Sequence, residues 1–300
     1  MFPQLEDLDP TDDVLFKLIF GSNERKHITI DFLNALFERE GAEIIKDIEL
    51  PNVEFTPQHE GEKFVRVDIF ATTQNNKRIN IEMQRSNNHN MEKRTLYYWA
   101  QMFLNLPRLP SGHDYSELQP AITVNILNFK FLPSTEPYSR YSIFNAKNMH
   151  KLTDALDIYF LEVPKFAKKA FNEMSRFERW LAFFSNKFSK AEKEAMAVAE
   201  SAIQDAVETA NNFLMDEKEY WAYLNRQSAV RDYNSAINGA RNEGLAKGLA
   251  KGLAEGLAEG EDKMLRLAHE LTKAGRTDDL NKILADKSLL PEFYQEFGIQ

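Results

Sequence analysis

Residues 67–84 read VDIFATTQNNKRINIEMQ, and this stretch predicts the β-hairpin around which the fold is built. Apolar side chains alternate on both sides of a polar middle, which is the pattern of two strands joined by a turn. If residues 73–77 form the loop, paired residues have numbers that sum to 150, so Asp68 lies opposite Glu82. One face then carries both acids, Arg66 and Gln84. The other face is apolar and carries Val65, Val67, Ile69, Ile79, Ile81 and Met83.

The two acids have two interpretations. Carboxylates directly opposite each other repel, and Mg²⁺, which prefers oxygen ligands, would relieve that repulsion. Alternatively, the acids are ordinary charges on a solvated outer face, on which they alternate with Arg66, Arg78 and Asn80. A register shift of one residue would also move one acid to the other face. The spacing alone leaves both interpretations open.

The segments around the hairpin predict a mixed α/β layer. Apolar residues at helical spacing predict helices over 11–20, 24–40 and 91–106. Apolar runs predict strands over 42–54, 64–71, 78–84, 121–129 and 157–163, the last of them ending before Pro164. We therefore expect helices packed on a short mixed sheet.

From residue 166 onward the pattern is helical. We expect a first domain over 1–165, a helical region over 166–240, a Gly-Leu-Ala repeat over 241–261 and short C-terminal helices over 262–300. Each Gly in the repeat costs a helix about 1 kcal/mol relative to Ala. Small residues at every fourth position also allow two helices to approach closely. The repeat is therefore either a semi-flexible linker or a self-associating helix.

The composition bounds the class of protein. The chain has 300 residues, 43% hydrophobic, which is typical of a soluble globular protein. It has no Cys, which excludes disulfides and thiolate sites, and no apolar run approaches the ~18 residues of a membrane span. We expect a cytoplasmic protein without membrane contact. A net charge of −9 argues against coating nucleic acid through bulk positive charge, but a nuclease that binds through a metal is compatible with it.

An ordered series of motifs resembles the Rpn family of recombination-promoting nucleases, also called PD-(D/E)XK nuclease family transposases. The series is TDDVLFKLIFG (11–21), ITIDFLNALF (28–37), VDI (67–69), INIEMQ (79–84), KRTLYYWAQMF (93–103), DYSELQPAITVNILNF (114–129) and LEVPKF (161–166). The resemblance implies a restriction-endonuclease-like core, with Asp68 and Glu82 as the ligands of Mg²⁺ or another divalent cation. Gln84 stands where the superfamily motif usually has Lys, so it would orient water or an oxygen only by hydrogen bonds.

The resemblance also implies a reaction and a wider site. The reaction is metal-dependent hydrolysis of a DNA phosphodiester, linked to recombination or mobile elements. Asp13 and Lys17 belong to the family-like D-x-x-F-K element and share a helical face, although a surface ion pair explains them equally well. Arg94, Tyr98 and Gln101 form a polar strip that would reach phosphate or bases, and packing is an equal explanation for Tyr98.

Two other functions stay open. One is a catalytically weak scaffold that binds DNA or self-associates through the C-terminal helices. The other is an RNA or nucleotide hydrolase on the same core. Because the core does not resemble a DDE-type strand-transfer domain, we expect hydrolytic nicking or breakage without coupled insertion.

Overall fold

The computed structural model describes most of the chain. The described residues are 9–38, 41, 43–51, 54–55, 65–87, 89–105, 112–185, 187–189, 191–192, 195, 198 and 200–299. The chain divides into two compact units, Met1–Tyr223 and Leu224–Gln300. Among the described residues, no helix combines the length and apolar character needed to cross a membrane.

The first unit is an α/β layer. Its helices are α1 (Asp13–Phe20), α2 (Lys26–Phe37), α3 (Met91–Asn105), α4 (Arg176–Phe184), α6 (Ser201–Met215) and the start of α7 (Glu217–Lys273). Its strands are β1 (Ile48–Glu49), β2 (Glu54–Phe55), β3 (Val65–Arg66), β4 (Ile69–Thr73), β5 (Arg78–Gln84), β6 (Ala121–Leu127), β7 (Tyr138–Ser142) and β8 (Leu156–Glu162).

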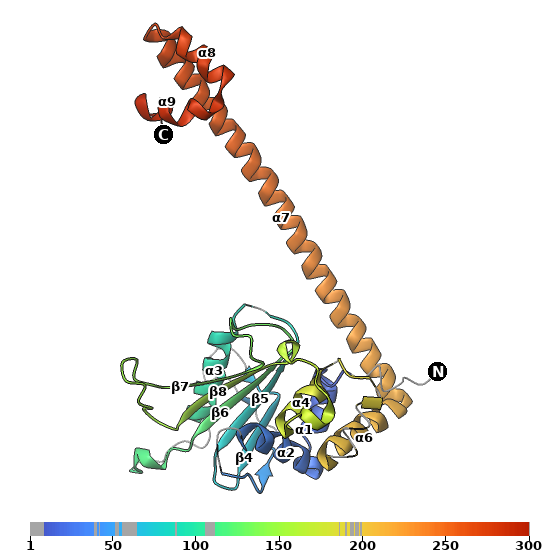
Figure 1. Cartoon of the computed structure of the whole chain (residues 1–300). Coiled ribbons are helices and arrows are strands. Elements are labelled where there is room, and N and C mark those ends of the chain that lie inside the picture. Colours follow the sequence, from blue (N-terminus) through green and yellow to red (C-terminus); the bar gives the residue numbers. More distant parts are fainter. Residues whose placement is uncertain are drawn as a thin grey trace. The chain divides into compact units, whose positions relative to one another are not determined.

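Six strands form one mixed sheet in the order β1-β4-β5-β6-β8-β7 (Figure 1). β5, β6 and β8 run parallel, whereas β4 pairs with β5, and β7 with β8, in antiparallel fashion. β2 and β3 form a separate two-stranded sheet. The predicted mixed sheet flanked by helices is confirmed.

Helices pack on both faces of this sheet. α3 lies on the face that carries Phe70 and Ala121, where Met102 joins their buried cluster. α2 lies on the opposite face, where the ring centroid of Phe37 is 5.4 Å from that of Tyr159 on β8. The β5 side chains on both faces are therefore buried.

Helix α4 belongs to the same unit as the sheet, although it follows residue 165. The Trp180 ring lies 5.6 Å from Phe20 of α1 and 5.8 Å from Phe32 of α2, measured between centroids. Trp180 Nε1 also donates a hydrogen bond of 2.9 Å to Asp31. The compact unit therefore continues to Tyr223, well beyond the expected boundary at residue 165.

Strand details differ from the prediction. Within the described part of the expected strand over 42–54, the strand residues belong to the short β1 and the start of β2; residues 42, 52 and 53 lie outside the described residues. The expected strand over 64–71 is divided by a bend at Asp68, and its residue 64 also lies outside the described residues. The bend breaks the alternation, so Val67 packs with Phe70 on the α3 side and its predicted place on the other face is wrong. The edge strand β7 was not predicted, because YSRYS lacks an apolar run.

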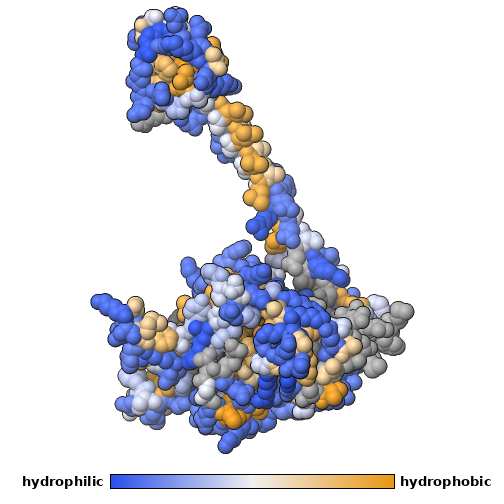
Figure 2. Space-filling model, viewed as in Figure 1, coloured by the Kyte–Doolittle hydropathy of each residue, from blue (hydrophilic) through white to orange (hydrophobic). Residues whose placement is uncertain are grey.

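The second unit contains the rest of α7 with α8 (Thr277–Ala285) and α9 (Leu290–Glu296). Leu267, Leu271 and Ile283 form its buried core. The repeat over 241–261 lies inside α7 and is helical. Its leucines, at positions 245, 249, 253 and 257, are 61–77% exposed, and Figure 2 shows hydrophobic surface along this part of α7.

Candidate active site

The hairpin of β4 and β5 brings the two predicted acids together. Ile69 pairs with Ile81 and Phe70 with Asn80, so the predicted register is confirmed. One step further along this register, Asp68 lies opposite Glu82. The Asp68 amide donates to Glu82 Oε1 (3.2 Å), and the Met83 amide donates to Asp68 Oδ2 (3.0 Å). Each acid is thus held in place by the backbone of the other strand.

Burial dominates the electrostatics of this pair. Glu82 is only 2% exposed, so the interpretation of the acid face as a solvated outer face is wrong. Burial, followed by the neighbouring charge of Asp68, raises the pKa of Glu82 to about 8. Burial also raises the pKa of Asp68, and the positive charge of Lys17 opposes that rise. Two carboxylates in this position need compensating positive charge in order to ionise together.

Helix α1 supplies one such charge. Lys17 Nζ lies 2.8 Å from Asp13 Oδ1 and 3.0 Å from Asp68 Oδ1. The i,i+4 pair with Asp13 therefore exists, and the same ammonium also contacts the acid of the hairpin. The structure therefore places Lys17 in contact with Asp68, and Asp13 in contact with Lys17.

The start of α1 is fixed by residues that the sequence interpretation missed. Asp12 is the N-cap, and its side chain accepts hydrogen bonds from the amides of Val14 and Leu15. Arg85, directly after β5, binds Asp9 (2.8 Å) and Asp12 (3.2 Å). Arg85 thereby ties α1 to the end of the strand that carries Glu82. The sequence signal for the cap was an acid directly before an apolar helical run.

Gln84 contacts the acid pair through Glu82. Its Nε2 atom donates to Glu82 Oε2 over 3.2 Å, and the residue is 9% exposed. A neutral amide here orients the carboxylate without adding charge.

Helix α3 supplies the second cation. Arg94 Nη2 lies 3.5 Å from Glu82 Oε2, and the guanidinium carbon lies 5.1 Å from the ring centroid of Tyr98. Gln101 lies one turn beyond Tyr98 and is half-buried. Arg94 thus contacts Glu82, and the Tyr98 ring contacts Arg94.

Comparison with known proteins decides the family. The profile of the family described as PD-(D/E)XK nuclease family transposase matches residues 10–240, which is more than half of the chain. The chain belongs to this family. A search of curated proteins and a search of solved structures each returned no match.

The family assignment confirms the resemblance and agrees with the fold. The mixed six-stranded sheet flanked by helices, with further helices after it, is consistent with a PD-(D/E)XK nuclease. All the predicted site residues lie within the matched range. A nuclease or transposase-like function follows from this membership.

Nucleases of the PD-(D/E)XK type generally use divalent metal ions, and the residues at the hairpin fit such an ion. Asp68 and Glu82 are hard oxygen donors that lie side by side. Asn80, fully buried on the same face of β5, has an amide without a partner in hydrogen-bond geometry among the described residues. Its oxygen adds a third hard donor close by. In the described part of the chain no three His, Cys, Asp or Glu side chains cluster as metal ligands, so the acidic donors here are a pair.

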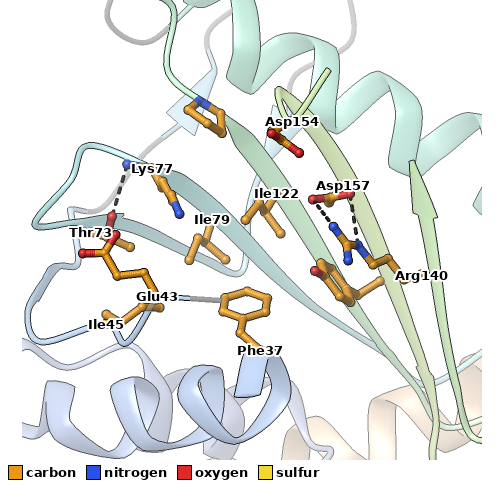
Figure 3. Close-up of a pocket in the computed structure, with 12 residues that line it drawn as sticks. Phe37, Glu43, Ile45, Thr73, Lys77, Ile79, Ile122, Arg140, Asp154 and Asp157 are labelled. Atoms are coloured by element: carbon orange, nitrogen blue, oxygen red, sulfur yellow. Dashed lines mark hydrogen bonds and ion pairs between the residues drawn. The ribbon is translucent and has the colours of Figure 1, made fainter. Parts of the chain in front are cut away.

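A separate cavity lies at the other end of the hairpin. Figure 3 shows this cavity, which measures about 360 Å³ and is lined by Phe37, Ile79 and Tyr159 on the sheet face opposite α3. Its buried acid, Asp157, already accepts two hydrogen bonds from Arg140, of 3.2 and 3.0 Å. The cavity contains none of the predicted site residues, so the acid pair is the candidate active site.

Proposed function

We propose that this protein is a Mg²⁺-dependent deoxyribonuclease of the recombination-promoting Rpn type, located in the cytoplasm. The observation that carries the proposal is the buried pair Asp68 and Glu82, held opposite each other within the family match and flanked by Lys17 and Arg94. In the proposed reaction, a water oxygen bonds to a DNA phosphorus while one P–O ester bond breaks. The leaving oxygen takes up a proton.

The residues have distinct proposed roles. Asp68 and Glu82 would hold the divalent cation, which when bound lowers the pKa of water and stabilises negative charge on phosphate. Lys17 places an ammonium 3.0 Å from Asp68 and takes over the positive charge that the motif lysine would supply. Gln84 orients Glu82.

Substrate binding is assigned to helix α3. Arg94 is half-exposed and forms charge-assisted hydrogen bonds to a backbone phosphate. Tyr98 supports the guanidinium, and Gln101 lies further along the same helix, where it contacts the DNA beyond the cleaved bond. Asp13 holds Lys17 from the solvent side, since its own side chain is 63% exposed.

The test is cleavage of supercoiled plasmid DNA with Mg²⁺ or with EDTA. We compare wild type with Asp68→Ala and Glu82→Ala, after circular dichroism has shown that all three are folded. The proposal expects nicked or linear DNA only from wild type with Mg²⁺. Equal inactivity of all three folded proteins contradicts it, and products of strand transfer contradict purely hydrolytic cleavage.

A second candidate function is a self-associating scaffold. The exposed leucines of the repeat favour it, because apolar side chains and glycines with no neighbouring atoms leave this helical surface open to a second copy. Light scattering of wild type and of a variant with Leu249→Ser and Leu253→Ser tests self-association. An identical mass for the two proteins contradicts assembly through the repeat.

A further inference from the structure

Arg94 occupies a position between a buried acid and solvent. Its side chain is 31% exposed, whereas that of Glu82 is 3% exposed. The separation of 3.5 Å between Arg94 Nη2 and Glu82 Oε2 exceeds the 2.7–2.9 Å typical of charge-assisted hydrogen bonds. The guanidinium therefore faces Glu82 as a positive charge without a close hydrogen bond to it.

The same guanidinium would compete with a cation at the acid pair. The other groups that are described as bonding to Glu82 are the Asp68 amide and the Gln84 and Asn80 side chains, which are uncharged. Arg94 thus supplies positive charge to Glu82 from α3, as Lys17 does to Asp68 from α1. A divalent cation that binds Glu82 meets repulsion from Arg94 for as long as the guanidinium stays in place.

DNA offers Arg94 another partner. A guanidinium keeps its charge and matches the oxygens of a phosphate with a planar fork of donors. The Tyr98 ring, 5.1 Å from the guanidinium carbon, supports the side chain near the surface. Because the Arg94 side chain is 31% exposed, a phosphate that arrives from solvent can reach the guanidinium.

We propose that Arg94 couples DNA binding to metal binding. When DNA binds, the guanidinium moves from Glu82 to a backbone phosphate, and Glu82 is released to bind the divalent cation. This inference rests on the proposed nuclease function. Because coupling between two ligands is reciprocal, bound metal also strengthens DNA binding by the same factor.

The test measures Mn²⁺ binding to the full-length protein by electron paramagnetic resonance of the free ion. Mn²⁺ is used because it prefers the same oxygen ligands as Mg²⁺. Each protein is titrated alone and with a duplex carrying phosphorothioate linkages, and binding to the duplex alone is subtracted. The proteins are wild type, Arg94→Met and Lys93→Met. The last is the matched control, because Lys93 is the exposed neighbour on the same helix and its loss removes the same charge.

In wild type and Lys93→Met, we expect DNA to lower the Kd for Mn²⁺ by about tenfold or more. In Arg94→Met, we expect tight Mn²⁺ binding without DNA and a DNA effect below about twofold. If Arg94→Met does not fold, Arg94→Gln takes its place in the experiment, and the expected result is the same.

Two results overturn the inference in different ways. If the Arg94 variants retain the full DNA effect, or lose Mn²⁺ binding in both conditions, the coupling role is wrong while the metal site stands. If wild type binds no Mn²⁺ with or without DNA, the proposed metal site fails and the coupling fails with it.

Discussion

Lys17 and Asp68 form an ion pair of 3.0 Å between a helix and a hairpin that are far apart in the sequence. Gln84, which the resemblance places where the superfamily motif usually has lysine, donates a hydrogen bond to Glu82 and carries no charge. Helix α1 therefore brings an ammonium to the acid pair from a different element. This contact connects the N-terminal D-x-x-F-K element to the proposed chemistry.

Replacing Lys17 tests that connection. We expect Lys17→Met to reduce DNA cleavage about tenfold to a hundredfold, because a positioned charge at the phosphate is lost. The pKa of Asp68 should also rise further, since Lys17 opposes the effect of burial. The pH profile of initial rates should therefore shift to higher pH. Lys26→Met, which removes a surface ion pair with Asp47, is the control. Unchanged rates in Lys17→Met would show that the contact has no role in catalysis.

The raised pKa of Glu82 predicts how stability depends on pH. Folding raises this pKa from 4.5 to about 8, so between these values the folded protein binds more protons than the unfolded chain. This stabilisation is fully present below pH 4.5 and is lost as the pH rises through about 8, with a slope of up to about 1.4 kcal/mol per pH unit. Asp68, Arg94 and Tyr98 face the carboxyl group. Urea unfolding in EDTA at pH 5, 6, 7 and 8 should show this loss in wild type and a flatter dependence in Glu82→Gln. If stability depended on pH in the same way in both proteins, the raised pKa of Glu82 would not be the cause of that dependence.

A buried ion pair at the end of β8 predicts a large effect on stability. Lys165 Nζ lies 2.6 Å from Glu162 Oε1, and Glu162 Oε2 accepts hydrogen bonds from the amides of Phe131 and Leu132. Lys165→Met leaves a buried carboxylate without its cation and should cost about 3–5 kcal/mol in the free energy of unfolding. The double variant with Glu162→Gln should recover part of the loss.

The control for this buried pair is an exposed one. Lys168 and Glu192 also form an ion pair, of 2.7 Å, but both side chains are more than 40% exposed. Lys168→Met should change the unfolding free energy by less than about 1 kcal/mol. Equal effects of Lys165→Met and Lys168→Met would contradict the importance of burial.

Truncation tests where the first unit ends. A chain ending at residue 165 lacks Trp180 and Phe184, which pack on Phe20 and Phe32. Loss of a large buried aromatic side chain typically costs about 3–5 kcal/mol. We therefore expect residues 1–165 to show no cooperative thermal transition by circular dichroism and residues 1–223 to show one. A cooperative transition in the shorter chain would show that residues 1–165 fold without α4 and would support the predicted boundary at residue 165.

The hairpin register was predictable because it depends on local information. Alternation and the polar loop were enough to place Asp68 opposite Glu82, and the ladder from Ile69 to Ile81 confirms that register. The side of Val67 was predicted wrongly, because a bend at Asp68 interrupts the alternation and no residue type announces it. Burial of Glu82 was also out of reach, since it depends on how α3 packs on that face of the sheet.

The composition of the site was partly predictable. The D-x-x-F-K element indicated that Asp13 and Lys17 share a helical face, but their proximity to Asp68 depends on how α1 packs. Arg94 was proposed to bind substrate, and its contact with Glu82 depends in the same way on the packing of α3. No pattern in the sequence predicted that Arg85 binds Asp9 and Asp12; the sequence indicated only that Asp12 could be an N-cap.

The repeat within α7 has a period of four residues, so its length can change by whole units of the same sequence. Duplicating or deleting one Gly-Leu-Ala-x unit keeps the reading frame and the helix, so such a change is tolerated by the backbone. Each added unit lengthens the helix by about 6 Å and turns everything after it by about 40° relative to the residues before it. About nine additions would return the helical phase of the repeat to its starting value.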